Sequence, residues 1–126
     1  MRVYEFTAPY FEVDSSVPFL GFANNPTNQY FWMQRDEKSP DRAVPDVGDV
    51  WVERDDQAWG GRGGICRVVL DRLSLTVELT PAQAEHMGGY DAIRVLFAFS
   101  EEEFQKIRQQ LAWVMRAYES ILEFRV

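Results

Sequence analysis

The chain has 126 residues, a formal net charge of -7, one cysteine and one histidine. This length suits a single domain over residues 1–126, and one cysteine cannot form an internal disulfide. The acidic balance argues against nucleic-acid binding, which requires basic clusters against the phosphates. The sequence contains no apolar run long enough to span a membrane, and its N-terminus lacks a signal-peptide pattern. The composition therefore favours a cytoplasmic protein.

Short segments rich in β-branched and aromatic residues predict strands in the first half of the chain. A charged stretch with two prolines, residues 36–46, is predicted to be a surface loop. The predicted strands are residues 3–6, 19–23, 30–35, 49–54 and 65–70.

The clearest periodicity lies in residues 72–79, where leucine and valine alternate with polar residues. Residues 93–99 repeat this pattern. A period of two indicates strands with one buried and one solvated face, as in antiparallel sheets.

Two helices are predicted from their capping residues. Thr80 begins a short helix that a glycine pair ends about two turns later, and Ser100 with Glu103 begins a longer helix that runs to about residue 120. Trp113 points away from the apolar stripe of the longer helix, so it is either covered by another segment or exposed as a binding anchor. The stripe consists of Phe104, Ile107, Leu111, Val114, Met115, Tyr118 and Leu122.

Catalytic chemistry has few candidate residues. His86 is the only histidine, and we expect it to be structural or at the surface. Cys66 lies in an apolar strand with no activating neighbour beyond Arg67, so we expect a buried, inert thiol. Two residues of these types are too few for a zinc site. We therefore expect no catalytic residue, cofactor or metal.

Carboxylates gather at Asp46, Asp49, Glu53, Asp55 and Asp56. They could bind a divalent cation or act as an acid and base pair, but their spacing is not that of an EF-hand loop. A protein-binding surface is the preferred interpretation.

The run Trp-Gly-Gly-Arg-Gly-Gly at residues 59–64 superficially suggests a phosphate-binding loop. It lacks the Lys-Ser/Thr pair of a nucleotide loop, and a predicted strand follows it instead of a helix. The glycines are predicted to allow positive φ angles in a wide turn that displays Trp59 and Arg62 at its tip.

A candidate interface surrounds this turn. Trp51, Glu53 and Asp55 alternate, so they share a face if the strand persists, although Trp51 could equally belong to the core. Aromatic and arginine anchors within an acidic rim are typical of protein interfaces. The predicted partner-binding residues are Trp51, Glu53, Asp55, Asp56, Gln57, Trp59, Arg62 and Trp113.

Residues 50–57, which contain Glu53, Asp55 and Gln57, are followed by the glycine loop with Gly64 and by a strand pair. This arrangement resembles the bacterial polymorphic-toxin immunity protein family ten, and the order of elements is similar over roughly residues 19–118. The resemblance implies a cytoplasmic antidote that binds and blocks a cognate toxin domain, with no chemistry of its own.

Together these patterns predict an alpha+beta domain. It would contain a mostly antiparallel sheet of about six or seven strands, a C-terminal helix packed on one face, and a short helix before the last strand. The leading functional hypothesis is occlusion of a toxin, which could be a basic nuclease. The alternatives are a small-molecule-binding module or small enzyme with a carboxylate-lined pocket, and a structural subunit of a bacterial secretion or phage assembly. The oligomeric state stays open.

Overall fold

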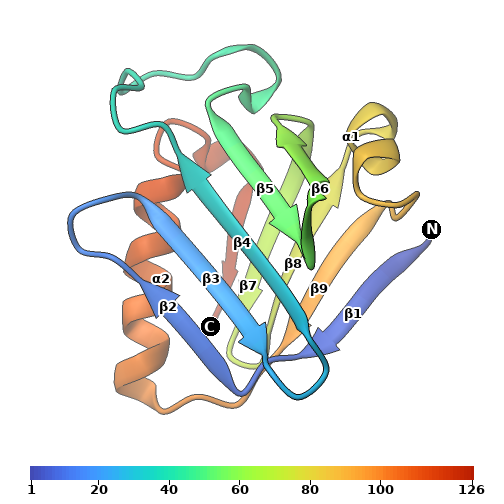
Figure 1. Cartoon of the computed structure of the whole chain (residues 1–126). Helices are drawn as coiled ribbons and strands as arrows, with labels where there is room; N and C mark the ends of the chain where they lie inside the picture. The colour runs from blue at the N-terminus through green and yellow to red at the C-terminus, as the bar shows by residue number, and fades with distance from the viewer.

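The computed structural model describes residues 1–126 as two five-stranded sheets that face each other, with two α-helices (Figure 1). Neighbouring strands pair antiparallel, except that β1 pairs parallel with β9 and β10 pairs parallel with β7. The first sheet has the order β1 (Val3–Thr7), β9 (Ala92–Leu96), β8 (Ser74–Leu79), β7 (Ile65–Asp71) and β10 (Leu122–Arg125). The second sheet has the order β2 (Tyr10–Val13), β3 (Phe19–Asn24), β4 (Gln29–Arg35), β5 (Val50–Arg54) and β6 (Asp56–Arg62).

The predicted alpha+beta class and the mostly antiparallel pairing are confirmed, but the strands number ten and form two sheets. The additional strands are β2, β6 and β10, of which β2 and β10 have only four residues each. The prediction of a wide turn at residues 59–64 is wrong, because β6 pairs with β5 as far as Arg62. Of the four glycines in this run, only Gly63 and Gly64, which follow β6, have positive φ angles, of 72° and 68°.

Both predicted helices are present. Thr80 caps α1 (Pro81–His86), and Ser100 with Glu103 forms the capping box of α2 (Glu101–Val114). The second helix ends at Val114 instead of near residue 120, and two short 3-10 helices lie at Pro45–Val47 and Glu119–Ile121. Neither α1 nor α2 has the length and apolar character needed to cross a membrane.

The inward faces of both sheets and one side of α2 share a single cluster of buried apolar residues. The helix packs against β2, β3 and β4, and it lies behind β2 and β3 in Figure 1. Phe22 of the second sheet stacks on Phe97, which follows β9 of the first, at 5.4 Å between ring centroids. Because period-two strands place alternate residues inward, this shared core determines which side chains of the second sheet face outward.

The short helix α1 packs against β6 through Gln83, which is buried. Its side-chain amide donates hydrogen bonds to the carbonyls of Gly61 (2.9 Å) and Gly63 (3.0 Å). A Cβ at position 61 would lie 2.6 Å from Gln83 Oε1. The glycine run therefore allows a helix to approach the strand closely.

Arg35 at the end of β4 is fully buried and connects three segments. Its guanidinium lies 3.1 Å from a carboxylate oxygen of Asp49, and its Nε donates to Ser39 Oγ at 2.7 Å. It also donates to the carbonyl oxygens of Pro40, at 2.8 Å, and Arg116. The predicted loop at residues 36–46 is thereby attached to the segment that follows α2.

Tyr118 completes the same cluster. Its hydroxyl donates to Asp49 Oδ1 at 2.5 Å and accepts from the Val44 amide at 3.0 Å. Burial and the hydrogen bond to Asp49 raise the pKa of Tyr118 above its ordinary value.

Replacing Arg35 with methionine is expected to lower the free energy of unfolding by about 3–5 kcal/mol, because Asp49 is then buried without a cation. Urea denaturation measures the change. Arg67→Met is the control, since its exposed ion pairs with Glu78 and Glu123 contribute about 1 kcal/mol or less. Equal losses in the two variants would contradict a special role for Arg35.

Candidate functional site

The outer face of the second sheet, which faces the viewer in Figure 1, carries aromatic side chains where an exposed sheet face normally carries polar ones. In β4 the inward residues Phe31 and Met33 are fully buried, while the outward residues Tyr30 and Trp32 are only partly buried. Tyr10 of β2 is 55% exposed. We call the aromatic residues of this surface the aromatic face: Tyr10, Phe19, Tyr30, Trp32 and Trp51.

The strand register places Trp32 at the centre of this face. One row of directly opposed residues crosses all five strands of the second sheet. Residues opposed in this way lie side by side on one face of the sheet. The row consists of Glu12, Gly21, Trp32, Glu53 and Gly60.

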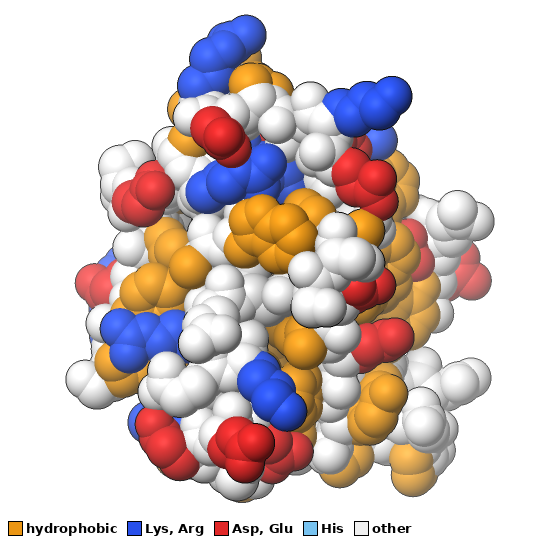
Figure 2. All heavy atoms as spheres, turned by 90° about the vertical axis from the view of Figure 1, so that its left-hand side faces the viewer, with side chains coloured by type: hydrophobic (Ala, Val, Ile, Leu, Met, Phe, Trp, Pro, Cys, Tyr) orange, Lys and Arg blue, Asp and Glu red, His pale blue; other side chains and the backbone are white.

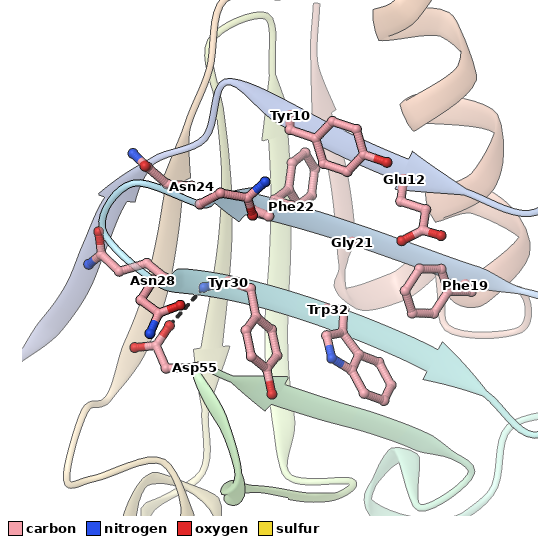
Figure 3. A pocket seen from close by; sticks show the side chains of 13 residues that line it. Tyr10, Glu12, Phe19, Gly21, Phe22, Asn24, Asn28, Tyr30, Trp32 and Asp55 are labelled. Carbon is pink, nitrogen blue, oxygen red and sulfur yellow. Dashed lines mark hydrogen bonds between the residues drawn. The ribbon is translucent and has the colours of Figure 1, made fainter.

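A first hollow, of about 420 Å³, lies over β2, β3 and β4. Figure 3 shows Tyr10 and Glu12 at one border, Tyr30 and Trp32 at the other, and Gly21 between them without a side chain. The lining includes the carboxylates of Glu12 and Asp55 but no lysine or arginine. The hollow is therefore suited to an apolar or positively charged group.

A second hollow, of about 390 Å³, lies on the other side of Trp32. Arg62 at its border donates two hydrogen bonds to the carboxylate of Asp36, at 2.8 and 2.9 Å. The lining consists of Trp32, Gln34, Asp36, Trp51, Glu53, Gln57 and Arg62.

Glu53 lies in the second hollow and is only 5% exposed. One carboxylate oxygen accepts from Trp51 Nε1 at 3.0 Å, and the other accepts from the Tyr30 hydroxyl. Burial and this bond to Glu53 raise the pKa of Tyr30. Glu53 thus holds two side chains of the aromatic face in place.

Asp55 has a role within the fold. It adopts a positive φ of 61° immediately after β5 and accepts from the Tyr30 amide at 2.8 Å. It also accepts from Arg54 Nη1 at 3.1 Å and from the Tyr4 hydroxyl. These bonds hold the turn between β5 and β6.

Trp59 lies on the opposite side of β6 from Gln57 and Arg62. Its ring is 5.1 Å from the guanidinium carbon of Arg54, which is buried and donates to the Met87 carbonyl at 2.9 Å. Trp59 is 41% exposed, but it does not line either of the two hollows.

The predicted partner-binding residues therefore divide into groups. Trp51, Glu53, Gln57 and Arg62 line the second hollow, whereas Asp55 lines the first. Asp56 is exposed, and its carboxylate accepts from the Ala58 amide at 2.8 Å.

Trp113 is half-buried on α2, away from the aromatic face. On the side of the molecule where α2 lies, Figure 2 shows hydrophobic side chains among acidic and basic ones. Trp113 lines neither of the two hollows.

Sequence reasoning missed Tyr10, Phe19, Tyr30 and Trp32. The available signal was the segment 30–33, which is apolar at both alternate sets of positions although only one set can face the core.

Cys66 is exposed, so the expected burial of its thiol is wrong. The pairing of β7 with β8 is irregular between Ile65 and Arg67, and Cys66 lies at this irregularity. Desolvation of the sulfur and nearby Glu78 raise the pKa of the thiol, which disfavours the reactive thiolate. His86 is also exposed, and the structure contains no group of three or more His, Cys, Asp or Glu side chains that could hold a metal ion.

The raised pKa of Tyr30 predicts a loss of stability at alkaline pH. The folded chain retains the Tyr30 proton to a higher pH than the unfolded chain, so this contribution is complete below about pH 10 and is lost as the pH rises through the folded-state pKa. We expect Tyr30→Phe to reduce the fall in the free energy of unfolding between about pH 9 and about pH 11, measured by urea denaturation. Tyr10→Phe, which alters an exposed tyrosine, should keep the wild-type pH dependence. An unchanged profile for Tyr30→Phe would contradict the assignment.

Comparison with known proteins adds a family assignment to this geometry. A search of curated proteins and a search of solved structures each found no match. The family model described as Immunity protein 10 matches residues 6–105. The matched region includes every strand from β2 to β9, and with them every residue of the aromatic face. The chain belongs to the immunity protein 10 family.

Proposed function

We propose that the protein acts in the cytoplasm, where it binds a cognate toxin domain through the aromatic face and blocks it without catalysis of its own. Membership of the immunity protein 10 family supports the immunity role and implies a toxin partner. The observation that carries the proposal is the set of partly exposed aromatic side chains on one sheet face, at positions where solvated residues are expected.

Such a face suits a protein partner. Aromatic residues are enriched among the few side chains that contribute most of the energy of protein interfaces. Phe19 and Trp32 contact each other with ring centroids 5.4 Å apart, and Trp51 is fixed by its hydrogen bond to Glu53. Because these side chains are already ordered, less conformational entropy is lost when a partner binds.

Charge favours a basic toxin. The chain has a net charge of -7, and Glu12 in the lining of the first hollow forms no ion pair. A nuclease that binds phosphates carries a positively charged surface, which an acidic inhibitor can approach rapidly and cover. A basic nuclease is therefore the toxin class that we propose, and occlusion of its substrate-binding surface is the mechanism.

Trp32→Ala is expected to weaken binding of a catalytically inactivated toxin domain by about 30-fold or more, because Trp32 lies between the two hollows. The domain to use is the C-terminal part of any large toxin found to be encoded beside this chain, and isothermal titration calorimetry gives the Kd. Leu73→Ala is the matched control, since Leu73 is 63% exposed and lies between β7 and β8 of the first sheet.

Two results would overturn the proposed function. One is the absence of binding between the wild-type chain and a demonstrably folded toxin domain. The other is equal affinity of wild type and Trp32→Ala, with circular dichroism showing that the variant is folded. Co-expression with the active toxin is the cellular counterpart, in which Trp32→Ala should protect cells less than Leu73→Ala does.

A basic toxin predicts that Glu12→Lys slows association and weakens its dependence on salt, because exposed charges contribute mainly to the rate of encounter. Stopped-flow fluorescence at low and high ionic strength measures both effects. Glu85→Lys makes the same charge change at an exposed position of α1 and should slow association less. Equal effects of the two variants would contradict steering toward the aromatic face.

A further inference from the structure

One buried charge in this structure lacks an ion pair. Four charged residues are buried: Arg35, Asp49, Glu53 and Arg54. Arg35 pairs with Asp49 at 3.1 Å, and Arg54 pairs with Asp55 at 3.1 Å. Glu53 forms no ion pair. A carboxylate removed from water without a cation is costly, so Glu53 stands out from the other three.

Glu53 is open to the second hollow and retains capacity to accept hydrogen bonds. Trp51 and Tyr30 each donate one bond, to different oxygens of the carboxylate. An ionised carboxylate offers about four acceptor positions, so roughly two remain. These can be reached only from the hollow that Glu53 lines, because the side chain is otherwise enclosed.

The other charges of the second hollow balance each other. Arg62 Nη1 donates to both carboxylate oxygens of Asp36, at 2.8 and 2.9 Å. Arg62 forms its ion pair with Asp36 and none with Glu53. The hollow has a net negative charge that arises from Glu53.

We propose that the second hollow receives an arginine side chain of the toxin, which pairs with Glu53 between the indoles of Trp32 and Trp51. This inference rests on the proposed function and identifies the chemistry that the aromatic face recognises. The arginine supplies the cation that Glu53 lacks in the free protein.

Arginine fits the lining better than lysine does. Its planar guanidinium matches a carboxylate in a two-bond geometry, stacks on aromatic rings and is more weakly hydrated than an ammonium group. The remaining N–H groups can donate to the side-chain carbonyl oxygens of Gln34 and Gln57, which also line the hollow.

The central test is Glu53→Gln, which removes the charge and retains the shape. We expect this variant to bind the catalytically inactivated toxin domain about 30-fold or more weakly than wild type, as when one partner of a buried charge pair is lost. Glu78→Gln makes the same change on the outer face of the first sheet, and its Kd should stay within about threefold of wild type.

Tyr30→Phe separates charge recognition from side-chain positioning. This variant breaks the same Tyr30–Glu53 hydrogen bond but leaves the carboxylate charged. We expect its loss of affinity to be at least about tenfold smaller than that of Glu53→Gln. Equal losses would mean that Glu53 acts by holding Tyr30, and the proposal would be overturned. If Glu53→Gln fails to fold, Tyr30→Phe is compared with wild type: we expect a loss of about threefold or less, and a loss of about 30-fold would overturn the proposal.

A double-mutant cycle identifies the bound side chain. Each arginine and lysine on the surface of the toxin domain is changed to glutamine and measured against wild type and Glu53→Gln. Substitution of one arginine should weaken binding of the toxin domain to wild type but not to Glu53→Gln, with a coupling of about tenfold or more. Additive effects throughout, or coupling to a lysine alone, would overturn the proposal.

The outcomes also separate this inference from the proposed function. If Trp32→Ala weakens binding while Glu53→Gln binds as wild type does, the aromatic face is the interface and only the arginine site is wrong. If wild type does not bind the folded toxin domain, the proposed function and this inference fail together.

Discussion

The second sheet depends on the buried ion pair between Arg35 and Asp49, which organises one end of the molecule. It connects the end of β4, the loop at residues 36–46 and the segment after α2. The next residue, Asp36, donates its amide to the Asp49 carbonyl at 3.0 Å and turns its side chain outward to Arg62. An interaction in the interior thereby determines the border of the second hollow. Because a buried guanidinium needs several acceptors in fixed directions, it specifies one arrangement of these segments.

The sequence predicted the fold best where only one face of a strand is apolar. Residues 74–79 alternate regularly, and the structure buries Leu75, Val77 and Leu79 while the intervening residues stay partly exposed. In β4 both sets of alternate residues are apolar, so periodicity could not show that Trp32 faces outward. That assignment requires knowing which face of the second sheet packs against the first sheet and α2 to form the core.

The candidate site was predictable in part for a similar reason. Trp51 and Glu53 alternate within one strand, and their common face follows from local geometry. Trp59 does not share that face, because its neighbour Gly60 lies opposite Glu53 and successive residues of a strand point to opposite faces. The glycines of β6 also have a tertiary cause, since Gly61 accommodates Gln83 of α1. Local sequence contains no information about which helix will approach a strand.

At Gly21 the shape of the outer surface can be altered separately from the strand pairing. Its φ lies outside the left-handed range, so the backbone of β3 does not require glycine there. A Cβ would meet the outer end of the Phe19 ring, at 3.1 Å, and no backbone atom is among its nearest neighbours. Glycine in the middle of a strand lowers stability by roughly 0.5–1 kcal/mol relative to alanine, and the chain accepts this cost at the floor of the first hollow. A larger residue at this position would reshape the surface that a partner meets while the strand pairing stays intact. Under the proposed function, substitutions in β3 would change which toxins related chains accept without requiring a new fold.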